Sequence, residues 1–180
     1  MKLTRRLTAA IALAASAVLL PAAASAAPAR SAPARSAAAA APACSTSLET
    51  WFAPEGNGYT GGAVYVVEFS NIGKATCTVT GYPTVKLTEN GTQVGLKATT
   101  SGAAPATVTL KPGQTAHVAL TIRDAGALCR PLPTNGLSVQ PPGKTAAPDF
   151  PLNSGACRHK STTDVDAISP GVGIPFYTHS

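Results

Sequence analysis

Three histidines and a pair of aspartates are the side chains whose type and spacing could begin an acid–base or metal site. None of His117, His159 and His179 lies at metal-ligand spacing from another histidine. His117 falls on the polar face of an expected strand, where a solvated surface histidine is the ordinary interpretation. Asp164 and Asp166 can share a strand face, but Ca²⁺ takes about six or more oxygen ligands and no further acidic residues flank them. We therefore expect no metal site and no cofactor.

Two other kinds of reactive site are missing from the sequence. No Gly-x-Ser-x-Gly motif offers a serine nucleophile. Met1 is the one methionine, so the rest of the chain has no thioether ligand for copper. We predict that the protein has no catalytic residues and is not an enzyme. A deep pocket lined by His117, or by Asp164 and Asp166, would revive a catalytic role.

Two features could contact a partner, and each also has an ordinary structural explanation. Arg130 lies in residues 127–133, Ala-Leu-Cys-Arg-Pro-Leu-Pro, a proline-stiffened loop with the preorganisation that a protease-inhibitory loop uses. A simple crossover loop accounts for the same residues. Trp51 and Phe52 are adjacent, so on a strand one faces the core and the other is partly exposed. An exposed aromatic ring can stack on carbohydrate, although single exposed apolar side chains are common.

The four cysteines predict two disulfides. They contain no Cys-x-x-Cys pair, which argues against structural zinc. Four cysteines allow three pairings, and the sequence alone leaves them open. We favour Cys44 with Cys77, which would pin the start of the domain to its central strand, and Cys129 with Cys157, which would close a proline-rich loop. Each bridge should contribute about 2 to 4 kcal/mol.

The first quarter of the chain has the composition of an export signal and a linker. A basic start, an apolar run over residues 7–20 and small residues ending at Ala26 predict a signal peptide over 1–26. The run of about 14 residues is short for a membrane span, which needs roughly 20; an uncleaved anchor is the alternative. Residues 27–43 repeat Pro-Ala-Arg-Ser-Ala and have no large apolar side chain to bury, so we expect a disordered tether. The domain then spans 44–174, with a tail over 175–180.

These assignments remove most of the chain's positive charge from the domain. The full chain has a net charge of +6, but five of its fourteen basic residues precede Cys44. Nine basic and eight acidic residues follow, with no basic cluster in the sequence. Nucleic-acid binding rests on a concentrated positive field, so we do not expect it. We expect a secreted, extracellular monomer that associates with the cell wall or an extracellular protein, without membrane insertion after signal cleavage.

Residues 62–83 predict two strands joined by a tight turn. Tyr65, Val67 and Phe69 recur at the two-residue period of a strand with one buried face. Residues 71–74, Asn-Ile-Gly-Lys, have turn composition, because Asn and Gly tolerate positive backbone angles. The return strand places Cys77 toward the core. We interpret this stretch as a hairpin at the centre of the domain.

The rest of the domain reads as short strands separated by turns, without a helical period. Expected strands cover 48–52, 82–88, 107–110, 115–123, 137–139 and 165–169, and a further one holds Val94 and Leu96 after the Asn90-Gly91 turn. Residues 111–114, Lys-Pro-Gly-Gln, form another turn. Proline-rich segments, such as 131–133, belong to edges and loops. Eight or nine short strands predict an all-β, antiparallel, immunoglobulin-like β-sandwich.

Several of these motifs together resemble the secreted domain-of-unknown-function family numbered 4232, common in actinobacteria. They are the Asn71 turn with Thr76-Cys77 and Gly81-Tyr82-Pro83, the turn over 110–116, Leu-Ser-Val-Gln-Pro-Pro at 137–142, and Ile-Ser-Pro-Gly at 168–171. The resemblance implies an exported, sandwich-like domain whose two disulfides are compatible with the favoured pairing, and it assigns no catalytic residue. We therefore favour a secreted, non-enzymatic module that binds a cell-envelope or extracellular partner. A secreted protease inhibitor acting through Arg130 is the alternative.

Overall fold

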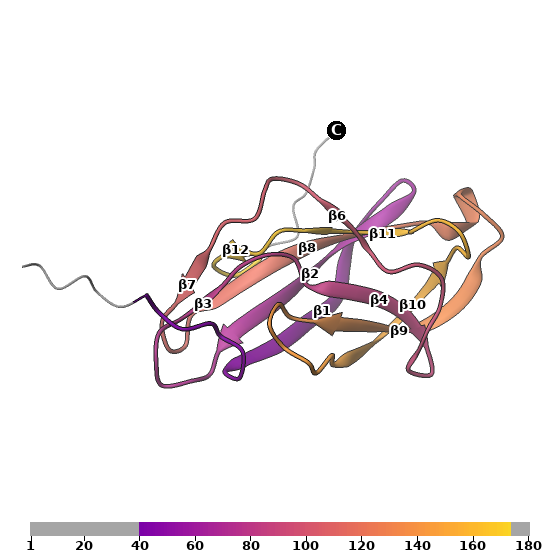
Figure 1. Cartoon of the computed structure of the whole chain (residues 1–180). Helices are drawn as coiled ribbons and strands as arrows, with labels where there is room; N and C mark the ends of the chain where they lie inside the picture. The colour runs from indigo at the N-terminus through magenta and orange to yellow at the C-terminus, as the bar shows by residue number, and fades with distance from the viewer. Residues whose placement is uncertain (1–39, 174–180) are drawn as a thin grey trace, which may run out of the picture. The chain divides into compact units, whose positions relative to one another are not determined.

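The computed structural model describes residues 40–173 (Figure 1). The predicted signal peptide, the tether up to residue 39, His179 and the tail lie outside the described residues. The strands are β1 (Leu48–Tyr59), β2 (Gly62–Asn71), β3 (Cys77–Val79), β4 (Thr84–Glu89), β5 (Thr92–Gln93), β6 (Thr99–Ser101), β7 (Val108–Leu110), β8 (Thr115–Arg123), β9 (Leu132–Gln140), β10 (Asp149–Ala156), β11 (Thr163–Asp166) and β12 (Ser169–Pro170). One 3₁₀ turn, η1 (Ala125–Ala127), separates β8 from β9. The described residues therefore hold twelve strand segments, more than the eight or nine expected, because several contain only two or three residues.

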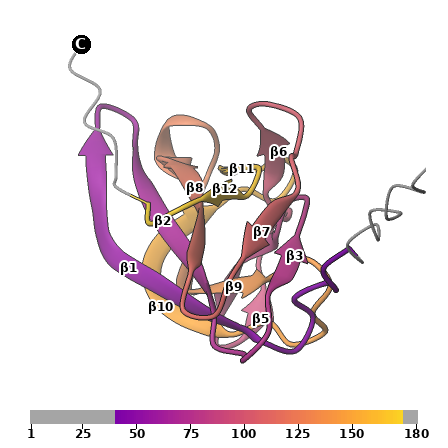
Figure 2. The ribbon, with the colours of Figure 1, turned by 90° about the vertical axis from the view of Figure 1, so that its left-hand side faces the viewer.

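The strands form two main sheets and one small pair. One sheet has the order β1-β2-β8-β11-β6, with β12 paired to β8; the other has the order β10-β9-β4-β5. Strands β3 and β7 make a separate pair, which lies nearest the viewer in Figure 2. Every strand pair is antiparallel except β6 with β11. The predicted antiparallel β-sandwich is confirmed, with that one parallel pair as an exception.

The core lies between the sheets, and in the central strand β8 every second residue contributes to it. Alternate residues of β8, from Ala116 to Ile122, are buried, as the sequence predicts. They lie in register with β2, where Val67 is opposite Val118 and Phe69 is opposite Ala116. The second sheet contributes Val85 and Leu87 from β4 and Leu137 and Val139 from β9. Burial of each large aliphatic side chain stabilises the fold by about 1.5 to 3 kcal/mol.

The predicted hairpin over residues 62–83 is wrong. Strand β2 pairs with β1 and β8, whereas β3 pairs with β7, with Cys77 opposite Leu110. The Asn71 backbone does not adopt a positive φ. Its side-chain oxygen instead accepts the Gly73 amide at 2.9 Å, which turns the chain out of the sheet. The chain does bend at these residues, but without the predicted positive φ at Asn71 or Gly73, and it leaves the bend toward a different partner.

Four other local predictions have mixed outcomes. The Asn90-Gly91 turn is confirmed, with φ of 50° and 77° at the two residues. Leu96 was expected to face inward but is 51% exposed. Strand β1 continues past Pro54 to Tyr59 through a register shift, where a break was expected. Pro133 lies within β9 and not in a loop, at a position where β9 pairs only with β10, which is an edge position as predicted for proline.

Strand β10 has no counterpart among the predicted strands. Its sequence, Asp-Phe-Pro-Leu-Asn-Ser-Gly-Ala, has four turn-forming residues and one proline, which obscure the two-residue period of a strand. Phe150 nevertheless packs on Phe52 with ring centroids 5.6 Å apart, and Phe52 packs on Tyr65 at 5.7 Å. The aromatic cluster therefore joins the edges of the two sheets. Within residues 40–173, no helix is long and apolar enough to cross a membrane.

Candidate functional site

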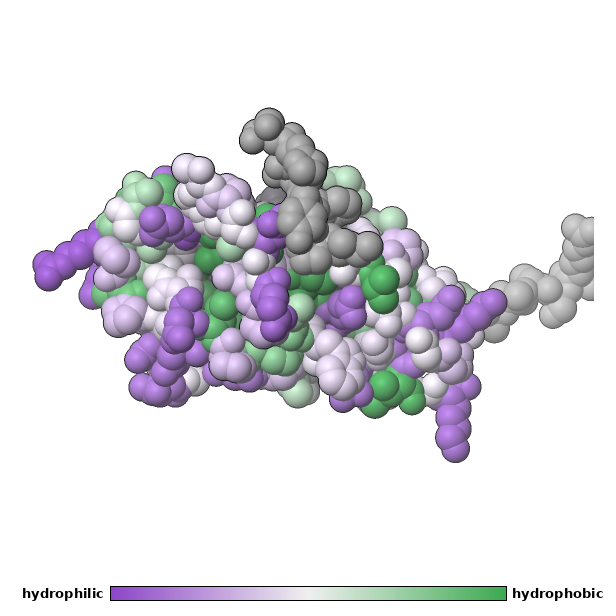
Figure 3. Space-filling model, turned by 180° about the vertical axis from the view of Figure 1, so that it is seen from behind, coloured by the Kyte–Doolittle hydropathy of each residue, from purple (hydrophilic) through white to green (hydrophobic). Residues whose placement is uncertain are grey.

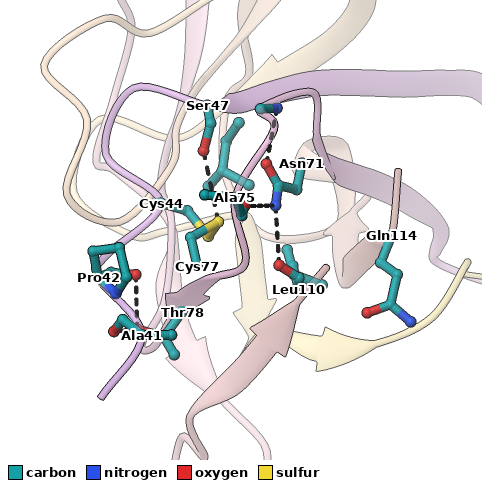
Figure 4. The surroundings of a disulfide bond; sticks show 12 residues. Ala41, Pro42, Cys44, Ser47, Asn71, Ala75, Cys77, Thr78, Leu110 and Gln114 are labelled. Atoms are coloured by element: carbon teal, nitrogen blue, oxygen red, sulfur yellow. Dashed lines mark hydrogen bonds between the residues drawn. A yellow bond between two sulfur atoms is a disulfide. The ribbon is translucent and has the colours of Figure 1, made fainter. Parts of the chain in front are cut away.

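Both favoured disulfides are present. Cys44–Cys77 fastens the start of the domain to β3 (Figure 4). The same junction has backbone hydrogen bonds from the Cys44 amide to the Thr78 carbonyl and from the Thr78 amide to the Pro42 carbonyl. Cys44 and Cys77 are 1% and 4% exposed, so this bridge is enclosed by the fold. We assign it a structural role.

Cys129–Cys157 joins two connections at one end of the domain, with 6.0 Å between the Cα atoms. The β8–β9 connection begins with η1, where the Asp124 carboxylate accepts the Gly126 amide at 2.9 Å. The Cys129 amide donates to the Ala125 carbonyl, which continues this turn up to the disulfide. Cys157 directly follows β10. The disulfide therefore holds the β8–β9 connection against the β10–β11 connection.

A hollow of about 740 Å³ opens beside this second disulfide. Residues 128–132 line one side and residues 157–160 line the other. The less exposed lining residues are apolar: Leu128, Leu132 and the disulfide. The exposed residues are Pro131, Arg130, Arg158, His159 and Lys160. The hollow therefore has an apolar floor and a basic rim.

The lining residues of the hollow include no acidic side chain. Among the described residues, the one salt bridge joins Arg123 to Asp164, at 3.0 Å, and involves none of the rim. The guanidinium groups of Arg130 and Arg158 and the ammonium group of Lys160 form no side-chain hydrogen bond within residues 40–173. Three positive charges thus face one opening without a counter-charge. An anion could bind there through charge-assisted hydrogen bonds.

Sequence reasoning missed this basic cluster because Arg130 is far along the chain from Arg158 and Lys160. Arg130 comes 28 residues before Arg158, the same separation as that of the bridged cysteines. A signal was present: each cysteine of the pair is directly followed by an arginine, as Cys129-Arg130 and Cys157-Arg158. Once these cysteines are paired, the two arginines must start from neighbouring backbones. Figure 3 shows hydrophilic side chains projecting from this end of the domain, at the left of that view.

The residues considered for acid–base chemistry do not converge. The Arg123 guanidinium binds Asp164, and the Ser101 hydroxyl donates to Asp166 at 2.6 Å. His117 is half-buried and not fully solvated as expected, with Nδ1 3.0 Å from the Gly171 carbonyl oxygen. His159 is exposed on the rim of the hollow. Within residues 40–173, no three His, Cys, Asp or Glu side chains form a group that could hold a metal ion.

One exposed and one core-facing aromatic side chain were predicted on β1, and Trp51 is the exposed member. It is 54% exposed, while Phe52 packs toward the core. Beside Trp51 lies a small hollow of about 200 Å³ that Val66, Glu68 and Gly173 also line. On the face drawn in Figure 3, hydrophobic residues form separate small areas among hydrophilic ones. Trp51 therefore has the exposure of a stacking platform, but few neighbouring polar groups to orient a sugar.

A third hollow, of about 520 Å³, lies between the β6–β7 connection and the β11–β12 segment. Small apolar residues, such as Ala103, Ala104 and Ala106, dominate its lining. Its one charged residue, Asp166, already accepts the Ser101 hydroxyl. The lining of this hollow includes no cation and no histidine. The basic hollow at the second disulfide is consequently the better candidate for a functional site.

Comparisons with known proteins identify the family. Neither the curated proteins nor the solved structures include a significant match to the chain. The family model for a domain of unknown function, DUF4232, matches residues 44–169. The matched segment begins at the first disulfide cysteine and ends in β12, so it includes nearly every strand described above. The chain therefore belongs to the DUF4232 family of domains of unknown function.

Proposed function

We propose that this protein is a non-enzymatic extracellular binding module, and that the basic hollow beside Cys129–Cys157 is its contact site. The observation that supports this most directly is the convergence of Arg130, Arg158 and Lys160 on one apolar-floored opening. These cations come from two connections that a disulfide joins. Binding residues are often carried by loops that a rigid scaffold positions. The hollow is formed in this way, by two loops that the disulfide and the sheets hold in place.

The backbone beneath the hollow is held by more than the disulfide. The Asp124 amide donates to the Gly61 carbonyl at 2.8 Å, which ties the start of η1 to the β1–β2 hairpin. A Cβ atom added at Gly155 would lie 2.9 Å from the Ala125 Cβ, so β10 approaches the turn closely. Preorganised loops lose less conformational entropy when a ligand binds. This stiffness supports a binding role.

Two further observations support an extracellular, non-enzymatic role. All four cysteines are bridged, as is usual in an oxidising compartment. The carboxylates of Asp164 and Asp166 are engaged by Arg123 and Ser101 and lie outside the lining of the basic hollow. The hollow itself offers cations and one histidine, without a carboxylate or hydroxyl nucleophile among its lining side chains. These groups suit binding better than bond cleavage.

A pull-down tests this proposal. The protein is incubated with purified cell walls and with secreted and envelope proteins, alongside the Arg130→Gln/Arg158→Gln variant. Lys111→Gln is the matched control, because it removes one exposed cation from the β7–β8 turn, outside the hollow. We expect retention of the wild type and of the control, and loss of retention for the double variant. If the wild type associates with no envelope material, the binding function is abandoned.

A secreted protease inhibitor is the second candidate, because Arg130 is exposed and lies next to a disulfide. The backbone before it is less favourable to this role. The Ala127 amide donates to the Asp124 carbonyl and the Cys129 amide donates to the Ala125 carbonyl, so this segment is turned and not extended. Assays with trypsin-like and subtilisin-like enzymes separate the candidates. The inhibitor hypothesis is rejected if the proteases keep their full activity when this protein is present in excess, or if they rapidly cleave it after Arg130.

A further inference from the structure

We infer that the basic hollow binds a phosphomonoester group attached to a compact apolar body. This inference rests on the proposed function, because it names the ligand chemistry of the same site. Its basis is the combination of three convergent cations, an apolar floor and the absence of any acidic side chain from the lining. Each of these features selects a different part of the ligand.

The charge of the hollow selects a multiply charged anion. From Cys44 onward the chain has nine basic and eight acidic residues, and three of the nine line the hollow. The remainder, six basic against eight acidic, is net negative. The domain thus has a positive hollow on a weakly negative background, which draws an anion to this end. A carboxylate balances one charge, whereas a phosphomonoester carries about −1.5 to −2 at neutral pH.

The types of cation also favour phosphate. Arg130 and Arg158 present planar guanidinium groups, which bind phosphate oxygens through paired hydrogen bonds. The disulfide sets their starting points, since each arginine follows a cysteine of a bridge with 6.0 Å between Cα atoms. Lys160 adds a third cation and His159 a further ring nitrogen at the same rim. A tetrahedral group with three terminal oxygens can use donors that approach from several directions.

The floor and size of the hollow select the rest of the ligand. Leu128, Leu132 and the disulfide are less exposed than the cations, so they lie beneath the rim. The volume of about 740 Å³ is within the roughly 300 to 1,000 Å³ of small-molecule sites. The three cations line this one opening. A compact amphiphilic phosphate fits this layout better than an extended polyanion.

Hexyl phosphate tests the inference by calorimetry and by amide NMR shifts. The full chain is expressed in the periplasm of a bacterial host so that both disulfides form. We expect hexyl phosphate to bind more tightly than inorganic phosphate, hexanol or hexanoate, with shifts confined to residues 128–132 and 157–160. Arg158→Gln should weaken its binding about tenfold. Lys111→Gln should leave the affinity unchanged, and NMR spectra verify that each variant is folded.

The other outcomes decide against the inference in distinguishable ways. Equal binding of hexyl phosphate and hexanoate overturns the choice of phosphate. Binding only to phosphatidic acid vesicles, with no effect of Arg158→Gln, overturns the choice of the hollow. If the protein associates with envelope material but does not bind hexyl phosphate, this inference is rejected and the proposed function stands. If it binds neither, both are rejected.

Discussion

Replacing Asn71 with alanine should destabilise the domain by about 3 to 5 kcal/mol. The Asn71 side chain is fully buried. Its Nδ2 atom lies 2.9 Å from the carbonyl oxygens of both Ala75 and Leu110, and its Oδ1 atom lies 2.9 Å from the Gly73 amide nitrogen. Alanine removes all three hydrogen bonds. The Leu110 bond is fully buried and costs about 1 to 3 kcal/mol, while the two partly buried bonds cost about 1 kcal/mol each.

Asn71→Asp distinguishes the contribution of the hydrogen bonds to stability from the contribution of side-chain volume. Aspartate has nearly the shape of asparagine, and one oxygen can still accept the Gly73 amide. The other oxygen would face the carbonyl groups of Ala75 and Leu110 with no proton to donate. A buried carboxylate is also costly to remove from water. At neutral pH, Asn71→Asp should therefore destabilise the domain at least as much as Asn71→Ala.

Unfolding of the variants in guanidinium chloride measures these differences. Equal slopes of the free energy of unfolding against guanidinium concentration would show that the variants unfold in the same transition. The control is Asn135→Ala. Asn135 also makes two hydrogen bonds, to the Asn90 amide and side chain, but it is exposed. Water can replace these bonds, so this change should cost less than about 1 kcal/mol. The reasoning is refuted if Asn71→Ala costs no more than Asn135→Ala.

Two further predictions concern close packing and the second disulfide. A Cβ atom added at Gly136 would lie 2.3 Å from the Thr88 hydroxyl oxygen. Gly136→Ala should therefore destabilise the domain by about 1 to 3 kcal/mol, as measured by thermal unfolding. Gly58→Ala is the control, because Gly58 has open space around it and no positive φ, and it should be close to neutral. Replacing Cys129 and Cys157 with alanine should cost about 3 to 4 kcal/mol and abolish retention of envelope material, even at temperatures where circular dichroism shows the folded sheet. Retained binding in that folded variant would contradict the role of the disulfide in positioning the arginines.

The strands with the clearest alternation were predictable from the sequence. In β8, a buried residue at every second position repeats over the whole strand, and this pattern requires one buried face. The Asn90-Gly91 turn was predictable because its positive φ angles are a property of those two residues. Strand β10 was not predictable, because Pro151, Ser154 and Gly155 are typical of loops, although pairing with β9 holds them in a ladder.

The error at β2 and β3 has a different cause. Turn composition at residues 71–74 shows that the chain reverses or bends, but it does not show which strand comes next in the sheet. The buried Asn71 side chain binds the Leu110 carbonyl, 39 residues away, and so helps to place β3 against β7. A contact of this separation leaves no local pattern. The partner of β3 was therefore decided by the tertiary fold.

The all-β class, the presence of two disulfides, the main core face and the family could be predicted from the sequence alone. These follow from periodicity, cysteine count and shared motifs, which are properties of the chain read in order. Strand partners and the basic hollow were decided by the tertiary structure. Backbone hydrogen bonds are alike for nearly every residue, so alternation shows which face is buried and not which neighbour is paired. Arg130 and Arg158 become one site only when a distant pair of cysteines brings their backbones together.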